Sequence, residues 1–330
     1  DRERADVILM NTCAIRENAH NKVYLHLSEL KKLKRQRPLV VGVLGCMAQN
    51  LKEELTDIQP LVDVLAGPDA YRQLPMLIRT AMRSQEEGLD QKGLAVDLSE
   101  YETYHDVEPD RNDGVNAWIA VMRGCDNFCS FCVVPYTRGR ERSRDPQGII
   151  QEAHRIAAQG FKQITLLGQN VNSYRFGDWD FARLITAVAD VPGILRVRFT
   201  SPHPKDFPLP LLEAVASHPT ICKQIHLPLQ SGSDRILGSM NRTYTNREYR
   251  ALVDRILTLR SDIVLSTDVI CGFCGESDAD FEETYRLVEE IRFHSAFIFK
   301  YSERMNTIAA RKYSDDVTAT VKTERVTRLF

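Results

Sequence analysis

Short apolar runs alternate with amphipathic stretches in the N-terminal part of the chain. Three runs have the length of strands, namely residues 5–11, 39–44 and 62–66. Between the first two, apolar residues recur every three or four positions, which predicts a helix with one buried face, and a second helix is predicted over residues 71–82. We therefore predict a doubly wound α/β domain over residues 1–85.

A polar, acidic stretch without periodicity separates this part from the next. We interpret residues 86–114 as a linker for that reason. Beyond it, helical patterns separate six predicted strands at residues 117–122, 163–167, 195–199, 224–227, 263–270 and 296–301. The first of these runs is apolar without alternation, which is typical of a parallel strand covered on both faces. The predicted architecture of residues 115–330 is a partial (β/α)6 barrel.

Composition narrows the class of protein. With 43% hydrophobic and 27% charged residues among 330, the chain is globular and has a sizeable core. No apolar run approaches the roughly 18 residues that cross a bilayer, so no membrane partner is expected. The net charge of −2 indicates that any contact with RNA is local. Eight clustered cysteines favour metal binding in a reducing compartment, so we expect a cytoplasmic protein, or a mitochondrial matrix protein if the source is eukaryotic. We also expect a monomer.

Three cysteines lie directly after the first predicted barrel strand, at the end where barrel enzymes carry their chemistry. Cys125, Cys129 and Cys132 have the spacing Cys-x3-Cys-x2-Cys. Three thiolates can hold three irons of a [4Fe-4S] cluster and leave the fourth iron open to a substrate's amino and carboxylate groups. A structural zinc site needs four closed ligands, and a ferredoxin cluster needs a fourth cysteine nearby, whereas the next one here is Cys222. The spacing favours a radical S-adenosylmethionine (SAM) enzyme over both alternatives.

Two N-terminal cysteines form a second candidate site. Cys13 and Cys46 each follow the carboxyl end of a predicted strand, and parallel strands would bring them to the edge where open α/β sheets bind ligands. A second metal cluster and two unrelated, half-buried thiols both fit this pattern. Cys271 and Cys274 also invite interpretation as a redox or metal pair, but we interpret them as structural thiols at a strand end.

The strings NTCAIRENA and VVPYTRGRERSR carry a family resemblance. With the cysteine loop, they make the whole chain resemble the MiaB-type tRNA branch of the radical SAM methylthiotransferases. The ribosomal-protein branch typically has Ile-Arg-Gly at this point. The resemblance implies a radical [4Fe-4S] cluster on Cys125, Cys129 and Cys132, and an auxiliary [4Fe-4S] cluster on three N-terminal cysteines that include Cys13 and Cys46. We expect the third of these upstream of Asp1, so that the auxiliary site is incomplete in this sequence, and an RNA-binding TRAM domain beyond Phe330.

The resemblance also implies a reaction and a SAM pocket. One SAM methylates a sulfur of the auxiliary cluster, and a second is cleaved to a radical that takes hydrogen from carbon 2 of N6-isopentenyladenosine at position 37, in the tRNA anticodon loop, before methylthio transfer. An electron donor such as flavodoxin or ferredoxin is expected. Rival hypotheses are methylthiolation of another tRNA adenosine or of a ribosomal protein, and an iron–sulfur electron-transfer module. The residues that would line the SAM pocket are Gly168, Gln169, Asn170, Gln230 and Ser231.

Four arginines alternate just after the cysteine loop: Arg138, Arg140, Arg142 and Arg144. A period of two on an exposed segment predicts four guanidinium groups along one edge, where they would contact RNA phosphates. The alternative is a solvated run of charge that pairs with Glu141 and Asp145.

Overall fold

The computed structural model describes residues 2–14, 17–111 and 114–330, without the side chains of residues 17–19. The chain forms two compact units. The first unit consists of Asp1–Glu102, Cys132–Arg140 and Arg304–Thr307, and the second of Thr103–Phe131, Glu141–Glu303 and Ile308–Phe330.

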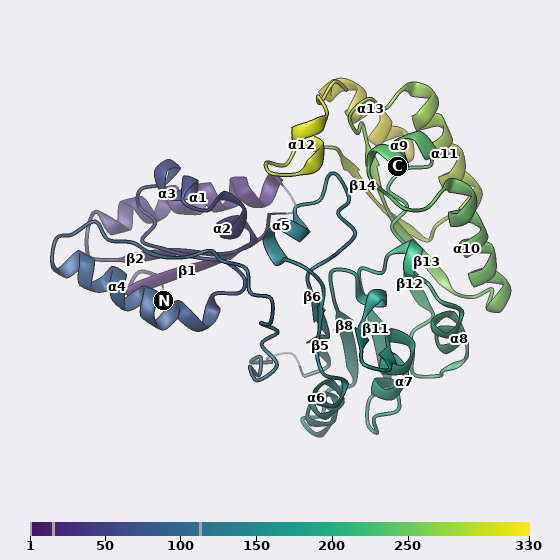
Figure 1. The fold of residues 1–330 in the computed structure, drawn as a ribbon, viewed down its shortest axis with the longest axis horizontal. Coiled ribbons are helices and arrows are strands. Elements are labelled where there is room, and N and C mark those ends of the chain that lie inside the picture. Colours follow the sequence, from purple (N-terminus) through teal and green to yellow (C-terminus); the bar gives the residue numbers. More distant parts are fainter. Residues whose placement is uncertain (1, 15–16, 112–113) are drawn as a thin grey trace. The chain divides into compact units, whose positions relative to one another are not determined.

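The first unit is built on a parallel sheet with the order β1-β2-β3-β4. Its strands are β1 (Val7–Thr12), β2 (Val40–Gly45), β3 (Val64–Ala66) and β4 (Gly93–Ala95). Successive residues of β2 point to opposite faces, so Val41 packs in the apolar cluster of α1 (Glu17–Lys34) and Val40 in that of α4 (Leu74–Glu86). Figure 1 shows α1 and α4 on opposite sides of this sheet. Helices on both faces agree with the predicted doubly wound domain.

Shorter elements complete this unit. They are α2 (Cys46–Leu51), α3 (Glu54–Ile58), η1 (Tyr71–Gln73) and α5 (Val134–Arg138). The helix α5 comes from the segment after the cysteine loop and packs against α2. Strand β4 lies within residues 86–114, which we interpret as a linker, and its pairing with β3 extends the sheet. The domain boundaries themselves stay a prediction.

The second unit contains six parallel strands in chain order. They are β5 (Asn116–Ala120), β8 (Gln163–Leu167), β11 (Arg196–Phe199), β12 (Gln224–His226), β13 (Val264–Cys271) and β14 (Ser295–Lys300). Strands β5, β8 and β11 pair side by side, as do β12, β13 and β14, and a parallel bridge from Val197 to Ile221 joins the two groups. All six predicted strands are present, which confirms the partial (β/α)6 barrel.

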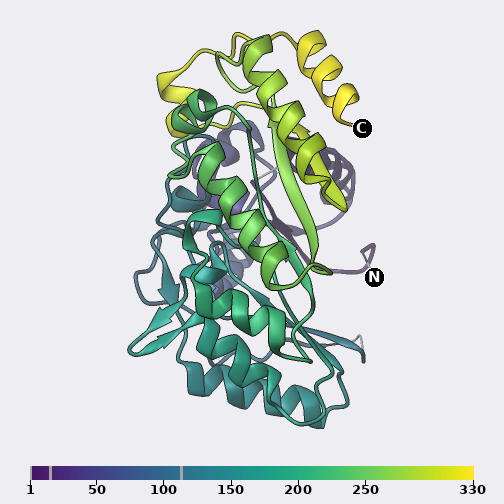
Figure 2. The same cartoon turned by 90° about the vertical axis from the view of Figure 1, so that its right-hand side faces the viewer.

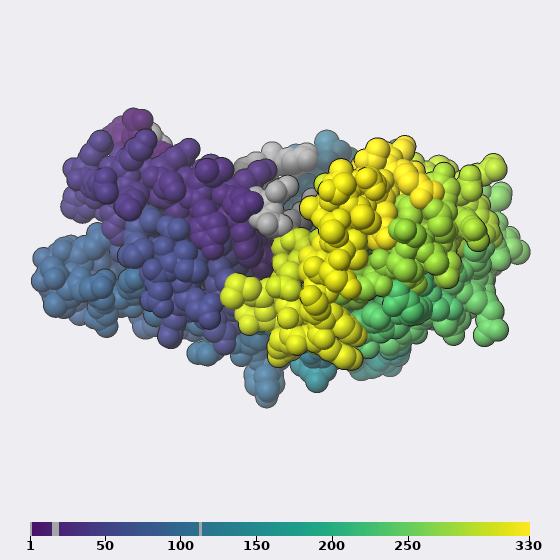
Figure 3. Space-filling model, turned by 90° about the horizontal axis from the view of Figure 1, so that it is seen from above, coloured from purple at the N-terminus to yellow at the C-terminus, as the bar shows by residue number. Residues whose placement is uncertain are grey.

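Helices follow the barrel strands and cover one face of them. They are α6 (Pro146–Ala158), α7 (Phe181–Ala189), α8 (Leu209–Ser217), α9 (Asp234–Ser239), α10 (Asn246–Leu259), α11 (Asp278–Ile291), α12 (Ile308–Lys312) and α13 (Ala319–Leu329). Figure 2 shows α10 and α11 in front of the strands. The helix α13 packs on β13 and β14, and in Figure 3 its yellow residues lie against the green ones of the same unit.

Small elements surround the candidate site. They are the hairpin of β6 (Met122–Arg123) with β7 (Arg142–Ser143), the hairpin of β9 (Arg175–Phe176) with β10 (Trp179–Asp180), η2 (Val171–Ser173) and η3 (Pro204–Asp206). Within the described ranges, no helix is long and apolar enough to span a membrane.

Strand β5 departs from our expectation. Ala117 and Ile119 are fully buried against the helices, but Trp118 is 51% exposed. The prediction that both faces of this strand are covered is therefore wrong. The physical reason is that β5 is an edge strand of an open barrel, so its inward-facing residues have no second layer of helices above them.

Candidate active site

The cysteine loop begins directly after β6 and is held by the turn that follows α9. Phe128 has φ +47°, a left-handed conformation that is costly for a bulky residue and persists only where the surroundings enforce it. The side-chain amide of Asn241 donates to the carbonyl oxygen of Phe128 at 2.9 Å. The backbone N–H of Ser130 donates to the carbonyl oxygen of Met240 at 2.8 Å. The turn thus fixes the loop on both sides of Cys129.

Cys129 is buried and has a cationic partner. Nη1 of Arg242 donates to its Sγ at 3.2 Å, while Nε of Arg242 donates to the hydroxyl of Tyr244 at 3.1 Å. Burial lowers the pKa of this guanidinium, but Tyr244 and Cys129 act the other way and hold it above its usual range. A permanent positive charge beside the sulfur stabilises the thiolate, which is the form that binds iron.

The other two cysteines of the loop have different surroundings. Burial raises the pKa of the Cys125 thiol to about 11. A backbone hydrogen bond from Asn127 offsets this rise only in part. A metal ion removes such a proton outright when it binds. In the first unit, Sγ of Cys132 accepts from the backbone N–H of Val134 at 3.5 Å. The loop therefore offers three thiols as ligands, and one of them, Cys129, has a preformed cationic partner.

These donors fit a cluster better than a single ion. In the described parts of the chain, no three His, Cys, Asp or Glu side chains gather where one ion could bind them. A structural zinc ion needs all its ligands around one centre, whereas a [4Fe-4S] cluster gives each thiolate its own iron. Cys125, Cys129 and Cys132 supply one thiol for each of three irons, one ligand fewer than a closed zinc site takes.

Several residues predicted to line the SAM pocket lie at the end of β8. A Cβ at Gly168 would come within 2.6 Å of Met122, so only glycine fits there. The amide oxygen of Gln169 accepts from the backbone N–H of Gly124 at 2.8 Å, which ties this residue to the cysteine loop. The amide nitrogen of Asn170 donates to Glu141 at 3.1 Å and to Asp206 at 3.0 Å.

Unsatisfied buried polar atoms mark the ends of three neighbouring barrel strands. Among the described residues, Oδ1 of Asn170 after β8, Nε2 of His203 after β11 and Oε1 of Gln230 after β12 have no hydrogen-bond partner. Buried polar atoms are normally hydrogen-bonded, so these three atoms suit a bound polar ligand. A ligand with hydroxyl, amino and carboxylate groups, such as SAM, has donors and acceptors for all three.

His203 was missed by the sequence reasoning. Burial, with Arg242 and Lys205 nearby, lowers its pKa to about 2, so its imidazole is neutral. Its Nδ1 accepts from the backbone N–H of Lys205 at 3.3 Å, which leaves Nε2 as the donor. Its position after the third barrel strand was the available signal. Ser231, which we predicted, is instead fully buried and hydrogen-bonded to Thr284 at 3.3 Å.

The N-terminal cysteines lie where the pattern predicts. Thr12, the last residue of β1, is in register with Gly45, the last of β2, so Cys13 and Cys46 follow the same edge of the sheet. Cys13 is exposed and Cys46 is buried. A Cβ at Gly45 would come within 2.6 Å of Thr12, so a glycine is needed for this close approach. Nε of Arg138 donates to Sγ of Cys46 at 3.1 Å.

The four arginines do not form one exposed edge. Arg140 is exposed and Arg138 is half-buried. The exposure that we assumed is wrong for Arg142 and Arg144, which are both buried. Arg144 donates to Glu152 at 2.9 Å and to the carbonyl oxygen of Ala120 at 2.6 Å, because the segment runs inward beside α6. Arg144 is thus paired, but with Glu152 and in a buried position, so it does not belong to a solvated run that pairs with Glu141 and Asp145. Phosphate contact by the four arginines stays a prediction.

The remaining cysteines are structural in character. Cys271 and Cys274 are both buried, and they belong to different apolar clusters. Burial raises the pKa of Cys271 to about 12 and also raises that of Cys274, so both favour the neutral thiol. This supports the interpretation of the CGFC run as strand-end thiols.

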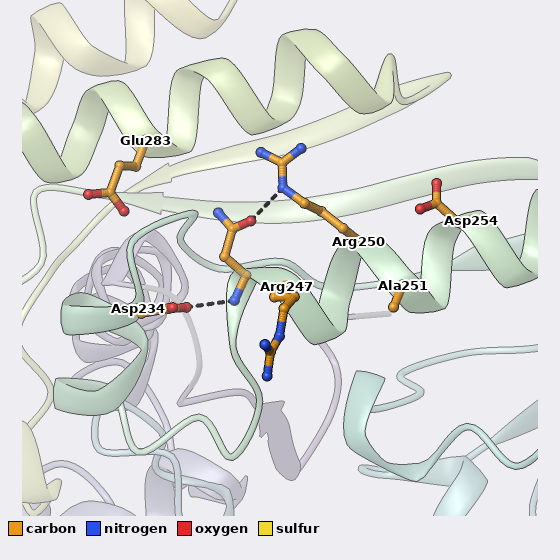
Figure 4. Close-up of a pocket in the computed structure, with 7 residues that line it drawn as sticks. Asp234, Arg247, Arg250, Ala251, Asp254 and Glu283 are labelled. Atoms are coloured by element: carbon orange, nitrogen blue, oxygen red, sulfur yellow. Dashed lines mark hydrogen bonds between the residues drawn. The ribbon is translucent and has the colours of Figure 1, made fainter.

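A cleft of about 520 Å³ lies elsewhere, between α9, α10 and α11. Figure 4 shows Asp234, Arg250, Asp254 and Glu283 around it, with Arg247 pointing away from Arg250. Its polar groups are engaged in capping: Asp234 accepts from the N–H of Asn246, whose side chain accepts from Arg250, both at 2.6 Å. None of its lining residues belongs to the cysteine loop or to the three strand ends with unsatisfied atoms. We therefore place the chemistry at the loop.

Comparisons with known proteins show which family the chain resembles in sequence. Residues 119–288 match the Radical SAM superfamily, and residues 1–67 match Uncharacterized protein family UPF0004. The chain is 48% identical to a tRNA-2-methylthio-N(6)-dimethylallyladenosine synthase from Prosthecochloris aestuarii, with 100% of this chain and 74% of that protein covered. It is also 48% identical to one from Porphyromonas gingivalis strain W83, with 99% and 72% covered.

Two solved structures share the fold. The radical SAM methyltransferase TsrM from Kitasatospora setae aligns with a TM-score of 0.65 at 14% identity, and this chain spans 63% of it while 92% of this chain is covered. The cobalamin-dependent SAM radical enzyme OxsB aligns with a TM-score of 0.64 at 12% identity, with 94% of this chain and 52% of that one covered. At these identities the likeness concerns the fold alone.

Proposed function

The chain belongs to the tRNA-2-methylthio-N(6)-dimethylallyladenosine synthase family of radical SAM enzymes, and on this premise we propose that it adds a methylthio group to carbon 2 of N6-isopentenyladenosine at position 37 of tRNA. The observation that carries the proposal is the cysteine loop at the end of the first barrel strands, with Arg242 already hydrogen-bonded to Cys129 at 3.2 Å. That pair is preformed for a thiolate, and a thiolate is what an iron–sulfur cluster requires.

The residues of the loop and strand ends take distinct roles in this proposal. Cys125, Cys129 and Cys132 hold three irons and leave one iron open. Asn170, His203 and Gln230 present their unsatisfied polar atoms to SAM. When bound, the cluster and SAM supply the electron and the radical chemistry. The protein contributes a buried, preorganised surface that orients SAM and excludes water.

The auxiliary [4Fe-4S] cluster belongs to this proposal, with Cys13 and Cys46 as two of its ligands. Support comes from the packing inside the first unit. Ala14, which follows Cys13, and Val133, which follows Cys132, form one buried apolar cluster with Cys46. Cys46 and the neighbours of two other cysteines, from distant parts of the sequence, thus share one small core. An auxiliary cluster bound to Cys46 would therefore lie near Cys132, the third cysteine of the radical loop.

The partners follow from the substrate. A base in the anticodon loop is already accessible for splaying out and stacking, so the enzyme need not open a duplex. We propose Arg140, which is exposed, as one contact to the RNA phosphates. A one-electron donor such as flavodoxin or ferredoxin, a monomeric state and a cytoplasmic location complete the proposal.

The test is a pair of substrates offered to one anaerobically reconstituted preparation with a strong reductant. Isopentenylated tRNA and ribosomal protein are incubated separately, and the nucleosides and peptides are analysed by mass spectrometry. We expect a methylthio group on the tRNA nucleoside only, and none on tRNA that lacks the isopentenyl group. A methylthio group on ribosomal protein, or deoxyadenosine formation with neither substrate modified, would overturn the proposed function.

A further inference from the structure

The contact between Arg138 and Cys46 lies outside everything that the sequence pattern predicts for this arginine. Arg138 is the last residue of α5, and its Nε donates to Sγ of Cys46, the first residue of α2, at 3.1 Å. The two helices pack against each other within the first unit. An arginine predicted to contact RNA phosphate is thus directed at a sulfur atom in the protein.

The surroundings of this guanidinium hold it in place. Asp69 and Tyr71 lie near enough to act on its charge, and Asp69 is itself fixed because it accepts from the backbone N–H of Ser99 at 3.1 Å. The hydroxyl of Tyr71 donates to Asn11 at 3.1 Å, close to the end of β1. Arg138 therefore donates to the sulfur of Cys46 in a region where the charge of Asp69 favours its guanidinium.

We propose that Arg138 is a positioning residue of the auxiliary cluster, which holds Cys46 as a ligand and stabilises the reduced cluster through its N–H···S hydrogen bond and its charge. This inference rests on the proposed function, because it requires a cluster on Cys46. Hydrogen bonds to the sulfurs and the net charge around a cluster set its reduction potential. A cation beside the sulfur favours the added electron and therefore raises that potential.

The position of α5 in the chain gives this contact a further role. The helix begins two residues after Cys132. Its last residue, Arg138, contacts Cys46, so one short segment connects the radical cysteine loop to Cys46. The same segment contributes Val133 to the buried cluster with Ala14 and Cys46. Arg138 and Val133 together fix Cys46 relative to the third cysteine of the loop. A shift of α5 would move Cys46 relative to Cys132 within this unit.

The experiment isolates the auxiliary cluster from the radical one. The full chain carries Cys125→Ala, Cys129→Ala and Cys132→Ala, is reconstituted anaerobically, and is titrated electrochemically while the reduced cluster is followed by electron paramagnetic resonance. Arg138→Ala removes charge and donor, Arg138→Gln keeps a donor, and Arg138→Lys keeps the charge. Arg79→Ala is the control, because it removes an exposed arginine of α4 in the same unit to which no binding role is assigned. Circular dichroism and thermal melting report on folding of each variant.

We expect a midpoint potential that is most negative for Arg138→Ala, intermediate for Arg138→Gln, nearest the parent for Arg138→Lys, and unchanged for Arg79→Ala. Retention of iron against a chelator should weaken by about 10- to 100-fold for Arg138→Ala, the usual cost of losing a residue that orients a ligand. If iron is bound but all variants share one potential, the role of Arg138 is overturned and the proposed function stands. The protein used for this titration also carries the third N-terminal cysteine that we expect upstream of Asp1, and if its triple cysteine background binds no iron, the auxiliary cluster of the proposed function is overturned as well.

Discussion

Two arginines in different units of the molecule contact a cysteine in the same way, but their surroundings differ. In the second unit, Arg242 is buried, and besides Cys129 it meets Tyr244 and the carbonyl oxygen of Pro228. In the first unit, Arg138 is only half-buried and faces Asp69 and Tyr71. Burial opposes the charge of both guanidinium groups, and their neighbours restore it.

The difference in burial means that the Arg242–Cys129 contact supports the fold, whereas the Arg138–Cys46 contact can change without unfolding the protein. A buried cation that loses its partners destabilises the fold, because its desolvation is no longer compensated. Arg242 also links Cys129 to the loop after β12, so the fold around it depends on this residue. Arg138 is closer to solvent and contacts the sulfur from the end of a short helix. We therefore expect changes at Arg242 to affect folding and cofactor binding together, and changes at Arg138 to affect mainly the cluster.

The largest effect is expected where all three ligands of one site are removed. Changing Cys125, Cys129 and Cys132 to Ala should abolish deoxyadenosine formation from SAM, because no protein ligand then holds the radical cluster. Cys222→Ser is the matched control and should cleave SAM at the parent rate. Chromatographic measurement of deoxyadenosine decides the matter. Equal amounts of deoxyadenosine from the triple variant and the parent would contradict the assignment of these three cysteines to the radical cluster.

A third arginine sharpens the comparison, because its partner is a carboxylate. Arg144 and Glu152 are both buried and form an ion pair at 2.9 Å. Arg144→Met leaves Glu152 with Arg111 as its remaining ionic partner and should lower the free energy of unfolding by about 1.5–3 kcal/mol, the value of a hydrogen bond to a charged group. Urea denaturation measures it, with Arg140→Ala as an exposed control expected to change stability by less than about 0.5 kcal/mol. A loss below about 1 kcal/mol for Arg144→Met would contradict the structural role.

Arg242 is expected to come next. Arg242→Lys keeps a charge but not the fork that reaches Cys129 and Tyr244 together. Retention of the radical cluster should weaken by about 10- to 100-fold, as for other residues that orient metal ligands. Iron release to a chelator measures this in a Cys46→Ala background, where only the radical cluster remains. Unchanged release would mean that the contact to Cys129 does not support the cluster.

The smallest effect concerns RNA. Arg140→Ala should weaken tRNA binding and reduce the slope of log affinity against log salt by about one, the contribution of a single phosphate contact. Arg144→Lys, which retains a buried cation, is the control and should keep the parent slope. Filter binding at several salt concentrations gives both values. Identical slopes for Arg140→Ala and the parent would show that Arg140 is a solvated surface residue and does not contact an RNA phosphate.

The strands and the cysteine loop could be predicted because each depends on local sequence. Apolar runs specify the six barrel strands, and the Cys-x3-Cys-x2-Cys spacing specifies the loop. The two arginine–cysteine contacts could not be predicted, because they join residues 92 and 113 positions apart. The same limit explains the error at Arg142 and Arg144. A period of two fixes which side chains share a face, but only the packing of α6 decides that this face is buried.

Strand β4 and the two hairpins were missed for a related reason. They contain two or three residues per strand, too few for a period to appear. Strand β4 forms on the unpaired edge of β3, whereas, among the described residues, β6 pairs only with β7 and β9 only with β10. His203 is another such case, since its role depends on burial beside Arg242 rather than on any motif. Tertiary contacts decide these features.

The central claim is that radical formation and sulfur transfer depend on different cysteines of the chain. The most direct measurement quantifies deoxyadenosine and methylthiolated nucleoside in one reaction with isopentenylated tRNA, for a parent protein that carries the third N-terminal cysteine expected upstream of Asp1 and for its Cys46→Ala variant. The account predicts that the variant still forms deoxyadenosine, because the barrel loop is intact, while methylthio transfer is lost. Methylthio transfer by Cys46→Ala at the parent rate, or loss of both products together, would contradict it.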